Sequence, residues 1–375
     1  MRMPTWPNGA RPSPMWLMAT RPKWPSQKPP VSTQTMIKKK SSSSSPMMAG
    51  PYRPRSPKLP VEKKERPMAL LNFGSKDTAG VEINPQVESF LKDYSIEVMP
   101  RTAEKIEDFR ELLPAATRVY IAHIEGTPIE DMVATAKRIA GEGFAVMPHF
   151  PARIIKDEAT LRNWIAMYQG EAGVEQALLL AGGVTQPHGD YDSSMQLLES
   201  GAFGDAGFKR LHVAGHPEGN KDIDPDGSMT NVDAALRWKQ AFSDTSDADM
   251  AIATQFCFEA APVIDWANDL AANGITLPIH IGVAGPAKLQ TLIKFSIACG
   301  VGASLRVLQR RAKDLTKLLL PFTPDEFLSD LAAHKVANPD FGISHVHFFP
   351  LGGIKTNANW AIENGGTSAT PASQS

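Results

Sequence analysis

The sequence has only two cysteines, Cys257 and Cys299, among its 375 residues. Two cysteines are too few for a disulfide framework or a Cys-based zinc site, so a reducing cytosol is the default and we expect a cytoplasmic protein. No stretch approaches the roughly 18 consecutive apolar residues that a membrane-spanning helix needs. The first residues also lack the apolar run of a secretory signal. These absences argue against a disulfide-stabilised secreted domain and against a membrane partner.

The net charge is also close to zero, because the chain has 39 basic and 40 acidic residues. The charges are segregated, however. Residues 1–67 hold 14 of the basic residues and 2 of the acidic ones, a net of +12, so the other 308 residues carry −13. An acidic body without Lys/Arg clusters argues against nucleic acid as a partner. The first 67 residues also hold 14 of the 31 prolines, which predicts disorder there.

Three interpretations of residues 1–67 stay open. They are a translated segment upstream of a start near Met68, a transit peptide, and an electrostatic tether to an anionic surface. Residues 361–375 are small and polar and predict a second tail. The body between them, residues 68–360, is long enough for a single domain with a sizeable core. The sequence leaves a homo-oligomer open.

Eight short apolar runs alternate with longer amphipathic segments through this body. Most runs are continuous, as expected for parallel strands covered on both faces. They are Tyr94–Met99, Arg118–Ile124, Phe144–His149, Gln176–Ala181, Lys209–Ala214, Met250–Cys257, Leu277–Val283 and Ser344–Phe349. Eight alternations over about 260 residues predict an α/β fold of the (β/α)8 TIM-barrel class. An open doubly wound sheet is the alternative, although no Gly-x-Gly-x-x-Gly follows the first run.

The segments between the runs predict helices. Four of them are Thr127–Ala140, Glu158–Gln169, Asn231–Phe242 and Ala260–Ala272. A further helix is expected after Thr323, whose side chain would cap it.

Polar residues gather where the predicted strands end, the edge at which barrel enzymes build their sites. Alternation places Ser95, Glu97 and Met99 on one strand face. If that face points inward, Glu97 is a carboxyl group in the barrel mouth. Burial would raise its pKa, and a carboxylic acid that stays protonated near neutral pH is a good general acid. A Glu paired with a Lys or Arg outside the barrel is the structural alternative.

Seven of the nine histidines lie in or just after predicted strands, which raises the possibility of a metal-dependent hydrolase. They are His123, His149, His212, His216, His280, His345 and His347. Most are isolated, however, and neither His-x-x-x-His nor Glu-x-x-His accompanies them on a helix. No metal site is therefore predicted.

Taken in order, the strand ends resemble the methylenetetrahydrofolate reductase family, whose fold is a (β/α)8 barrel. Four pieces carry the resemblance, which covers about residues 90–355. They are Ser95–Thr102 (SIEVMPRT), Ala214–Gly219 (AGHPEG), Ala253–Phe258 (ATQFCF) and Val346–Leu351 (VHFFPL).

The resemblance implies reduction of 5,10-methylenetetrahydrofolate to 5-methyltetrahydrofolate, with hydride from NADH or NADPH passed through bound FAD. It makes Glu97 the general acid that opens the five-membered folate ring. Gln255 would contact the pterin or the nicotinamide, with Phe258 or a neighbour stacking on the ring. His149 would contact the flavin, and Glu218 and Asn220 would reach its ribityl and diphosphate portion.

The sequence departs from the family where the flavin should lie. Ala181, Gly182 and Gly183 stand in place of the usual Arg-Gly-Asp, and His216 replaces a flavin-contacting tyrosine. Two hypotheses follow: FAD is bound with altered potential and weaker affinity, or nicotinamide gives hydride directly to the folate. A degenerate barrel that binds folate without turnover is the non-catalytic alternative.

Overall fold

The computed structural model describes residues 83–299, 307–309 and 321–366. The predicted tail at residues 1–67 lies outside the described residues, as do positions 367–375 of the predicted C-terminal tail. In the described part, eight strands pair in sequence order as neighbours and close into a barrel. Every strand pair is parallel, including the closing pair of first and last strands. The predicted TIM barrel is therefore confirmed.

Each of the eight apolar runs forms a strand. The strands are β1 Ser95–Val98, β2 Arg118–Ile121, β3 Ala145–Pro151, β4 Gln176–Leu180, β5 Arg210–Gly215, β6 Asp249–Cys257, β7 Ile279–Ala284 and β8 Ile343–Phe349. The continuous apolar character of the runs follows from this arrangement, because one face of each strand meets the helices and the other fills the barrel.

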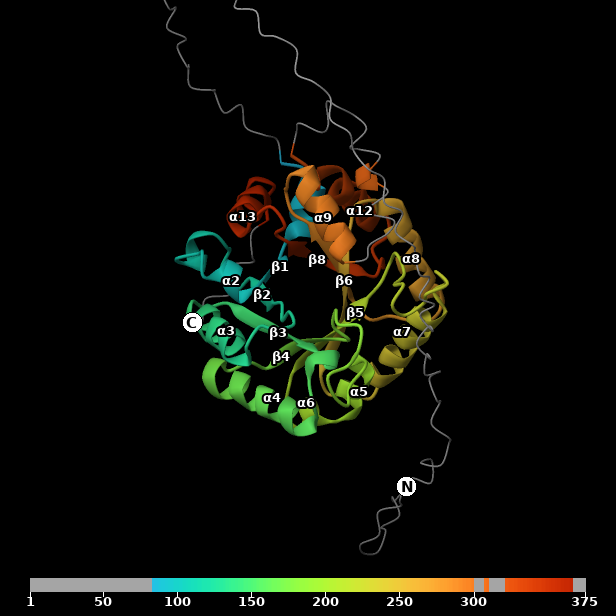
Figure 1. The fold of residues 1–375 in the computed structure, drawn as a ribbon. Helices are drawn as coiled ribbons and strands as arrows, with labels where there is room; N and C mark the ends of the chain where they lie inside the picture. The colour runs from blue at the N-terminus through green and yellow to red at the C-terminus, as the bar shows by residue number, and fades with distance from the viewer. Residues whose placement is uncertain (1–82, 300–306, 310–320, 367–375) are drawn as a thin grey trace, which may run out of the picture. The chain divides into compact units, whose positions relative to one another are not determined.

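Helices follow the strands and surround them (Figure 1). The α-helices are α1 Pro85–Leu91, α2 Pro100–Ala103, α3 Ile129–Gly141, α4 Glu158–Ala172, α5 Ser194–Glu199, α6 Ala202–Asp205, α7 Thr230–Ser243, α8 Ala260–Ala272, α9 Leu289–Ala298, α12 Asp325–Ala337 and α13 Ile354–Glu363. Two 3₁₀ turns, η1 Phe109–Glu111 and η2 Ala152–Ile154, complete the set. Among the described residues, no helix has both the length and the apolar character to cross a membrane.

Most helix ends lie within one to three residues of the predicted ones; α3, for example, begins at Ile129 rather than Thr127, and α4 continues to Ala172. Thr323 does not cap α12, because the helix begins one residue later than predicted, with Pro324 at the N-cap and no side-chain cap. Near the C-terminus, the last helix, α13, continues past residue 360 to Glu363. Its residue Ala361 is fully buried, so the packed fold includes the start of the predicted polar tail.

The barrel strands separate two apolar clusters, one outside the barrel and one inside it. The larger apolar cluster, which includes Ile96 and Val98 of β1, lies between strands and helices. A smaller cluster of Tyr120, Met147 and Leu178, together with Ala253, fills part of the barrel interior. The alternation predicted for β1 is therefore confirmed, and Ser95 and Glu97 point inward.

A register shift between β6 and β7 brings backbone into unusually close contact. The shift lies between Ala253 and Phe256, and within it the Thr254 hydroxyl accepts a hydrogen bond from the Gly282 N–H at 2.8 Å. A Cβ at Gly282 would lie 2.6 Å from backbone atoms of Thr254 and Gln255. Only glycine lets β7 approach this bulge, which in turn aims Gln255.

We therefore expect Gly282→Ala to lower the free energy of unfolding by about 1–3 kcal/mol, the usual cost of overpacking. Gly170→Ala in the interior of α4 is the matched control, because a Cβ there meets no atom within 4 Å. That change should raise stability by about 0.5–1 kcal/mol, since alanine favours helix. Denaturant unfolding of both variants measures the difference, and equal stabilities would contradict a tight contact at the bulge.

Candidate functional site

Glu97 lies near the C-terminal end of β1 and contacts two histidines from other strands. Its Oε2 is 3.4 Å from His149 Nε2 on β3 and 3.8 Å from His347 Nε2 on β8. The Glu97 side chain is 19% exposed, whereas those of His149 and His347 are 9% and 1% exposed. The Glu97 carboxyl group thus lies between two buried imidazoles and the solvent at the barrel mouth.

The expected rise in the pKa of Glu97 is wrong. Burial does raise its pKa, but the His347 and His149 imidazoles beside it outweigh that effect and hold the pKa below the ordinary value. Burial in turn lowers the pKa of His149 to about 4, against the opposing attraction of Glu97. The predicted rise assumed a carboxyl group without partners, and the two imidazoles reverse the direction of its pKa shift.

Below Glu97 the polar contacts continue into the barrel. His347 Nδ1 lies 2.9 Å from the Ser95 hydroxyl. The Tyr120 ring packs on His347 with centroids 4.2 Å apart, and its hydroxyl lies 2.6 Å from His212 Nδ1. All four of these side chains are almost fully buried. Their hydrogen bonds offset the cost of burying polar groups inside the barrel.

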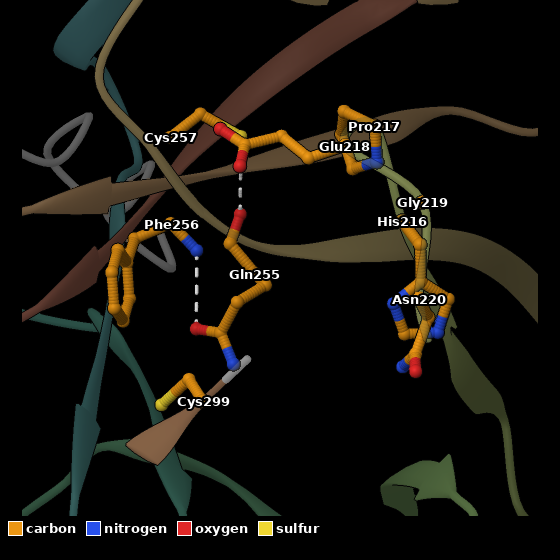
Figure 2. Close-up of a pocket in the computed structure, with 9 residues that line it drawn as sticks. All are labelled: His216, Pro217, Glu218, Gly219, Asn220, Gln255, Phe256, Cys257 and Cys299. Carbon is orange, nitrogen blue, oxygen red and sulfur yellow. Dashed lines mark hydrogen bonds between the residues drawn. The ribbon is translucent and has the colours of Figure 1, made fainter. Parts of the chain in front are cut away.

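A pocket of about 70 Å³ opens where β5 and β6 end. It is lined by His216, Pro217, Glu218, Gly219, Asn220, Gln255, Phe256, Cys257 and Cys299. Four of the predicted site residues, Gln255, His216, Glu218 and Asn220, therefore meet at one cavity (Figure 2). His216 and Asn220 lie across the pocket from Gln255.

Gln255 is oriented by the bulge in β6. Its Oε1 accepts a hydrogen bond from the Phe256 N–H at 3.1 Å, and its amide reaches toward Cys299 in Figure 2. Opposite, burial and the nearby Lys239 charge lower the pKa of His216 to about 4. The pocket therefore offers an amide and a neutral imidazole on facing walls, groups that hydrogen-bond a planar heterocycle.

The pocket and Glu97 are neighbours. The His347 ring packs on Phe349 with centroids 4.9 Å apart, and Phe349 packs on Phe256 in the pocket wall at 5.5 Å. Desolvation and then the charge of Glu97 raise the pKa of Cys299, another wall residue, to about 11. A ring held in the pocket would thus lie near the carboxyl group.

Both pocket thiols are poor nucleophiles. Burial and the Glu218 carboxylate raise the pKa of Cys257 well above its usual value. The raised pKa of Cys299 acts in the same direction. A protonated thiol attacks slowly, so covalent cysteine chemistry has no support at this site.

Other predicted residues lie outside this pocket. Phe258 packs edge-on against Phe256 and Phe322, with centroids 5.8 and 5.1 Å apart. Its stacking role stays a prediction, and Phe256 is the aromatic ring in the pocket wall. His149 faces Glu97, and its flavin contact also stays a prediction.

The loop after β4 contains the remaining predicted cofactor residues. Ala181 accepts a backbone hydrogen bond from Arg153 at 2.9 Å, and Gly182 has a φ of +97° that favours glycine. Gly183 follows and is exposed. The Arg153 guanidinium also binds the Asp192 and Asp222 carboxylates at 2.7 and 2.6 Å. Arg153 thereby ties the loops after β4 and β5 together beside the pocket.

Within the described residues, no group of three or more His, Cys, Asp or Glu side chains could hold a metal ion. Five of the seven histidines instead contact one another, Tyr120 or Glu97, whereas His123 contacts Thr127 and Trp164 and His216 lines the pocket. Nothing in the described part of the chain favours the hydrolase alternative.

Sequence reasoning missed the partners of Glu97. His347 appeared only as one histidine among several, while Ser95 had no assigned role and Tyr120 was not noticed. The register places Ser95 beside His347 and Glu97 beside Tyr120. The sequence does contain a hint of these partners. Arg118 and Tyr120 are two residues apart, as are His345 and His347, and this spacing puts polar residues on one face of each strand.

No family model matches the chain. Among solved structures, the fold is similar to an uncharacterised protein from Clostridium thermocellum that binds two copies of 5-methyl-5,6,7,8-tetrahydrofolic acid. The match has a TM-score of 0.50 and 10% sequence identity, and it covers 75% of this chain and 97% of the other. At this identity, the likeness shows that the barrel fold is shared.

The buried imidazoles predict acid sensitivity. In the folded chain the pKa of His149 is about 4, below its ordinary value of 6.5, so between these values the unfolded state binds more protons. Stability should fall as the pH drops from about 6.5 to about 4. We expect His149→Gln to reduce that slope by up to one proton. Denaturant unfolding across this pH range measures both slopes, and equal slopes for His149→Gln and the unsubstituted protein would contradict a neutral His149.

Proposed function

We propose that this barrel binds a reduced folate and interconverts 5,10-methylenetetrahydrofolate and 5-methyltetrahydrofolate by hydride transfer from NADH or NADPH. The observation that carries the proposal is the position of Glu97, a carboxyl group on two imidazoles beside a pocket lined by Gln255. Two further observations support it. The resemblance of the strand ends to methylenetetrahydrofolate reductases is one, and the folate bound by a protein of similar fold is the other.

In this proposal Glu97 protonates the folate nitrogen that leaves when the five-membered ring opens. The resulting iminium carbon then accepts hydride. At rest the carboxyl group is ionised, because its pKa lies below the ordinary value. When folate covers the mouth and excludes water, the protonated form of Glu97 becomes favoured, because burying a charge is costly. Substrate binding thereby favours uptake of a proton by the carboxyl group.

Gln255 supplies recognition. An amide can donate and accept hydrogen bonds along the edge of a pterin or nicotinamide ring, and Phe256 beside it offers an apolar wall. His216 on the facing wall is neutral near pH 7, so it too can donate and accept. The pocket is suited to a planar, uncharged ring.

The residues predicted to hold the FAD diphosphate do not fit that group. None of the described residues lining the pocket is Lys or Arg, and Glu218 contributes a negative charge there. Of the two nearby cations, Arg153 is held by two aspartates, and Lys239 is buried with its ammonium group donating to the Ala214 carbonyl. FAD stays a proposal beside direct transfer from nicotinamide, and the charges of the described pocket favour the direct route.

We expect Glu97→Gln to reduce folate-dependent NADH or NADPH oxidation at least 100-fold, because general acid catalysis typically contributes 10²–10⁴-fold. Folate affinity should change little, since the amide keeps the shape of the carboxyl group. Glu175→Gln, at an exposed Glu paired with Lys209, is the control and should act like the unsubstituted protein. Near-normal turnover by Glu97→Gln would reject the proposed acid. Tight folate binding without any turnover by the unsubstituted protein would instead indicate the non-catalytic barrel.

An absorbance spectrum of the purified protein tests the hydride route. Because the described pocket lacks a cation for the diphosphate, we expect no flavin bands, together with NADH or NADPH oxidation that depends on added methylenetetrahydrofolate. Flavin bands that bleach on addition of NADH or NADPH would establish the FAD route instead.

A further inference from the structure

A column of polar side chains runs through the barrel interior from Glu97 toward the N-terminal ends of the strands. In order, the polar column consists of His347, Ser95, Tyr120, His212, His280 and His345. Strands β1, β2, β5, β7 and β8 contribute to it. Barrel interiors are usually filled by branched aliphatic residues, so six polar side chains in contact are a departure that packing does not explain.

The upper half of the polar column is hydrogen-bonded. His347 Nδ1 lies 2.9 Å from the Ser95 hydroxyl. Ser95 lies close enough to Tyr120 to influence the pKa of the Tyr120 hydroxyl, and that hydroxyl lies 2.6 Å from His212 Nδ1. Each of these groups can donate one proton while accepting another. Proton transfer along them needs no movement of the backbone.

The lower half is a stack of imidazoles. The His212 and His280 ring centroids are 4.5 Å apart, and His280 lies parallel to His345 at 4.4 Å. His280 is 4% exposed and packed between these two rings, and its Nδ1 has no hydrogen-bond partner among the described residues. A proton passes through His280 when the ring turns within the stack to present that nitrogen to a neighbour. His345 is half-buried and contacts the exposed Ser344 hydroxyl at 2.9 Å, which gives the stack an opening to solvent.

Charges around the lower end keep the rings neutral. Burial lowers the pKa of His212, His280 and His345, and the Arg118 guanidinium lowers it further. The Arg210 guanidinium adds to this effect at His212 and His345. At His345, which lies next to solvent, the charge of Asp93 acts in the opposite direction and raises the pKa. Neutral imidazole can accept a proton at one nitrogen and release another from the second, which is how histidine shuttles protons.

Resting on the proposed role of Glu97, we propose that the polar column conducts protons from the N-terminal face of the barrel to Glu97. Each turnover moves one proton from Glu97 to the folate nitrogen, while bound folate covers the mouth. The carboxylate then takes a proton from His347, each member passes one upward, and His345 takes one from solvent. One proton enters at His345 and one leaves with the folate, so the number of protons on every residue is unchanged. Each imidazole then holds its proton on the other nitrogen, and the rings and hydroxyls turn back before the next turnover.

The first test removes one hydroxyl from the polar column. Tyr120→Phe breaks the link between Ser95 and His212, and Tyr168→Phe is the matched control. Tyr168 is equally buried, and its hydroxyl has no hydrogen-bond partner among the described residues. We expect Tyr120→Phe to keep a near-normal first turnover in rapid-mixing experiments but to lose at least tenfold in steady state, because only later turnovers need reprotonation. Equal loss in both phases, or no loss, would overturn the proposal, whereas Tyr168→Phe should resemble the unsubstituted protein.

The second test needs no activity. Solvent exchange of the His212 imidazole proton, followed by NMR on histidine-labelled full-length protein, should slow at least several-fold in His345→Gln. His334→Gln, at a half-buried histidine on α12, should leave it unchanged. Unchanged exchange in His345→Gln would reject entry from this face. If the unsubstituted protein fails to turn over folate, the first test rejects the proposed function, and this exchange rate still decides whether the polar column carries protons.

Discussion

A closed barrel confines inward-pointing side chains mainly to partners on other strands, because solvent reaches that space only at its ends. Here the constraint acts on polar residues. Tyr120 lies against His347 on one side and His212 on another, and Glu97 meets solvent at the mouth. Bringing these groups together requires β1, β2, β3, β5 and β8 in register, so the geometry of the site and closure of the barrel depend on the same contacts.

The same confinement sets the charge of the site. A solitary buried carboxyl group would be protonated, but two adjacent imidazoles lower the pKa of Glu97. The charge of Glu97 therefore depends on its neighbours as well as on its own burial. If folate covers the mouth as proposed, the exclusion of water favours the protonated form of Glu97. Substrate binding and acid activation would then be one event.

The sequence predicted the strands well because parallel barrel strands are apolar on both faces and need no long-range information to recognise. Alternation also placed Glu97 inward. The neighbours of Glu97 could not be predicted, because Ser95 and His347 are 252 residues apart and meet only through the register of the closing strands. The predicted rise in the pKa of Glu97 was wrong for the same reason, because the histidines that lower it come from distant parts of the sequence. At β6 the bulge interrupts the pairing, so sequence spacing alone could not decide whether Phe256 or Phe258 lines the pocket.

The barrel separates two tasks that a single cluster would combine poorly. Recognition of a planar ring needs fixed, neutral groups, and the ends of β5 and β6 supply them through His216 and Gln255. Supplying a proton needs groups that change state, and these lie deeper, behind Glu97. Burying aliphatic side chains in the interior would cost less free energy than burying histidines and a tyrosine. A departure of this kind from ordinary packing marks function when its members contact one another and reach the proposed acid, and the barrel interior meets both conditions.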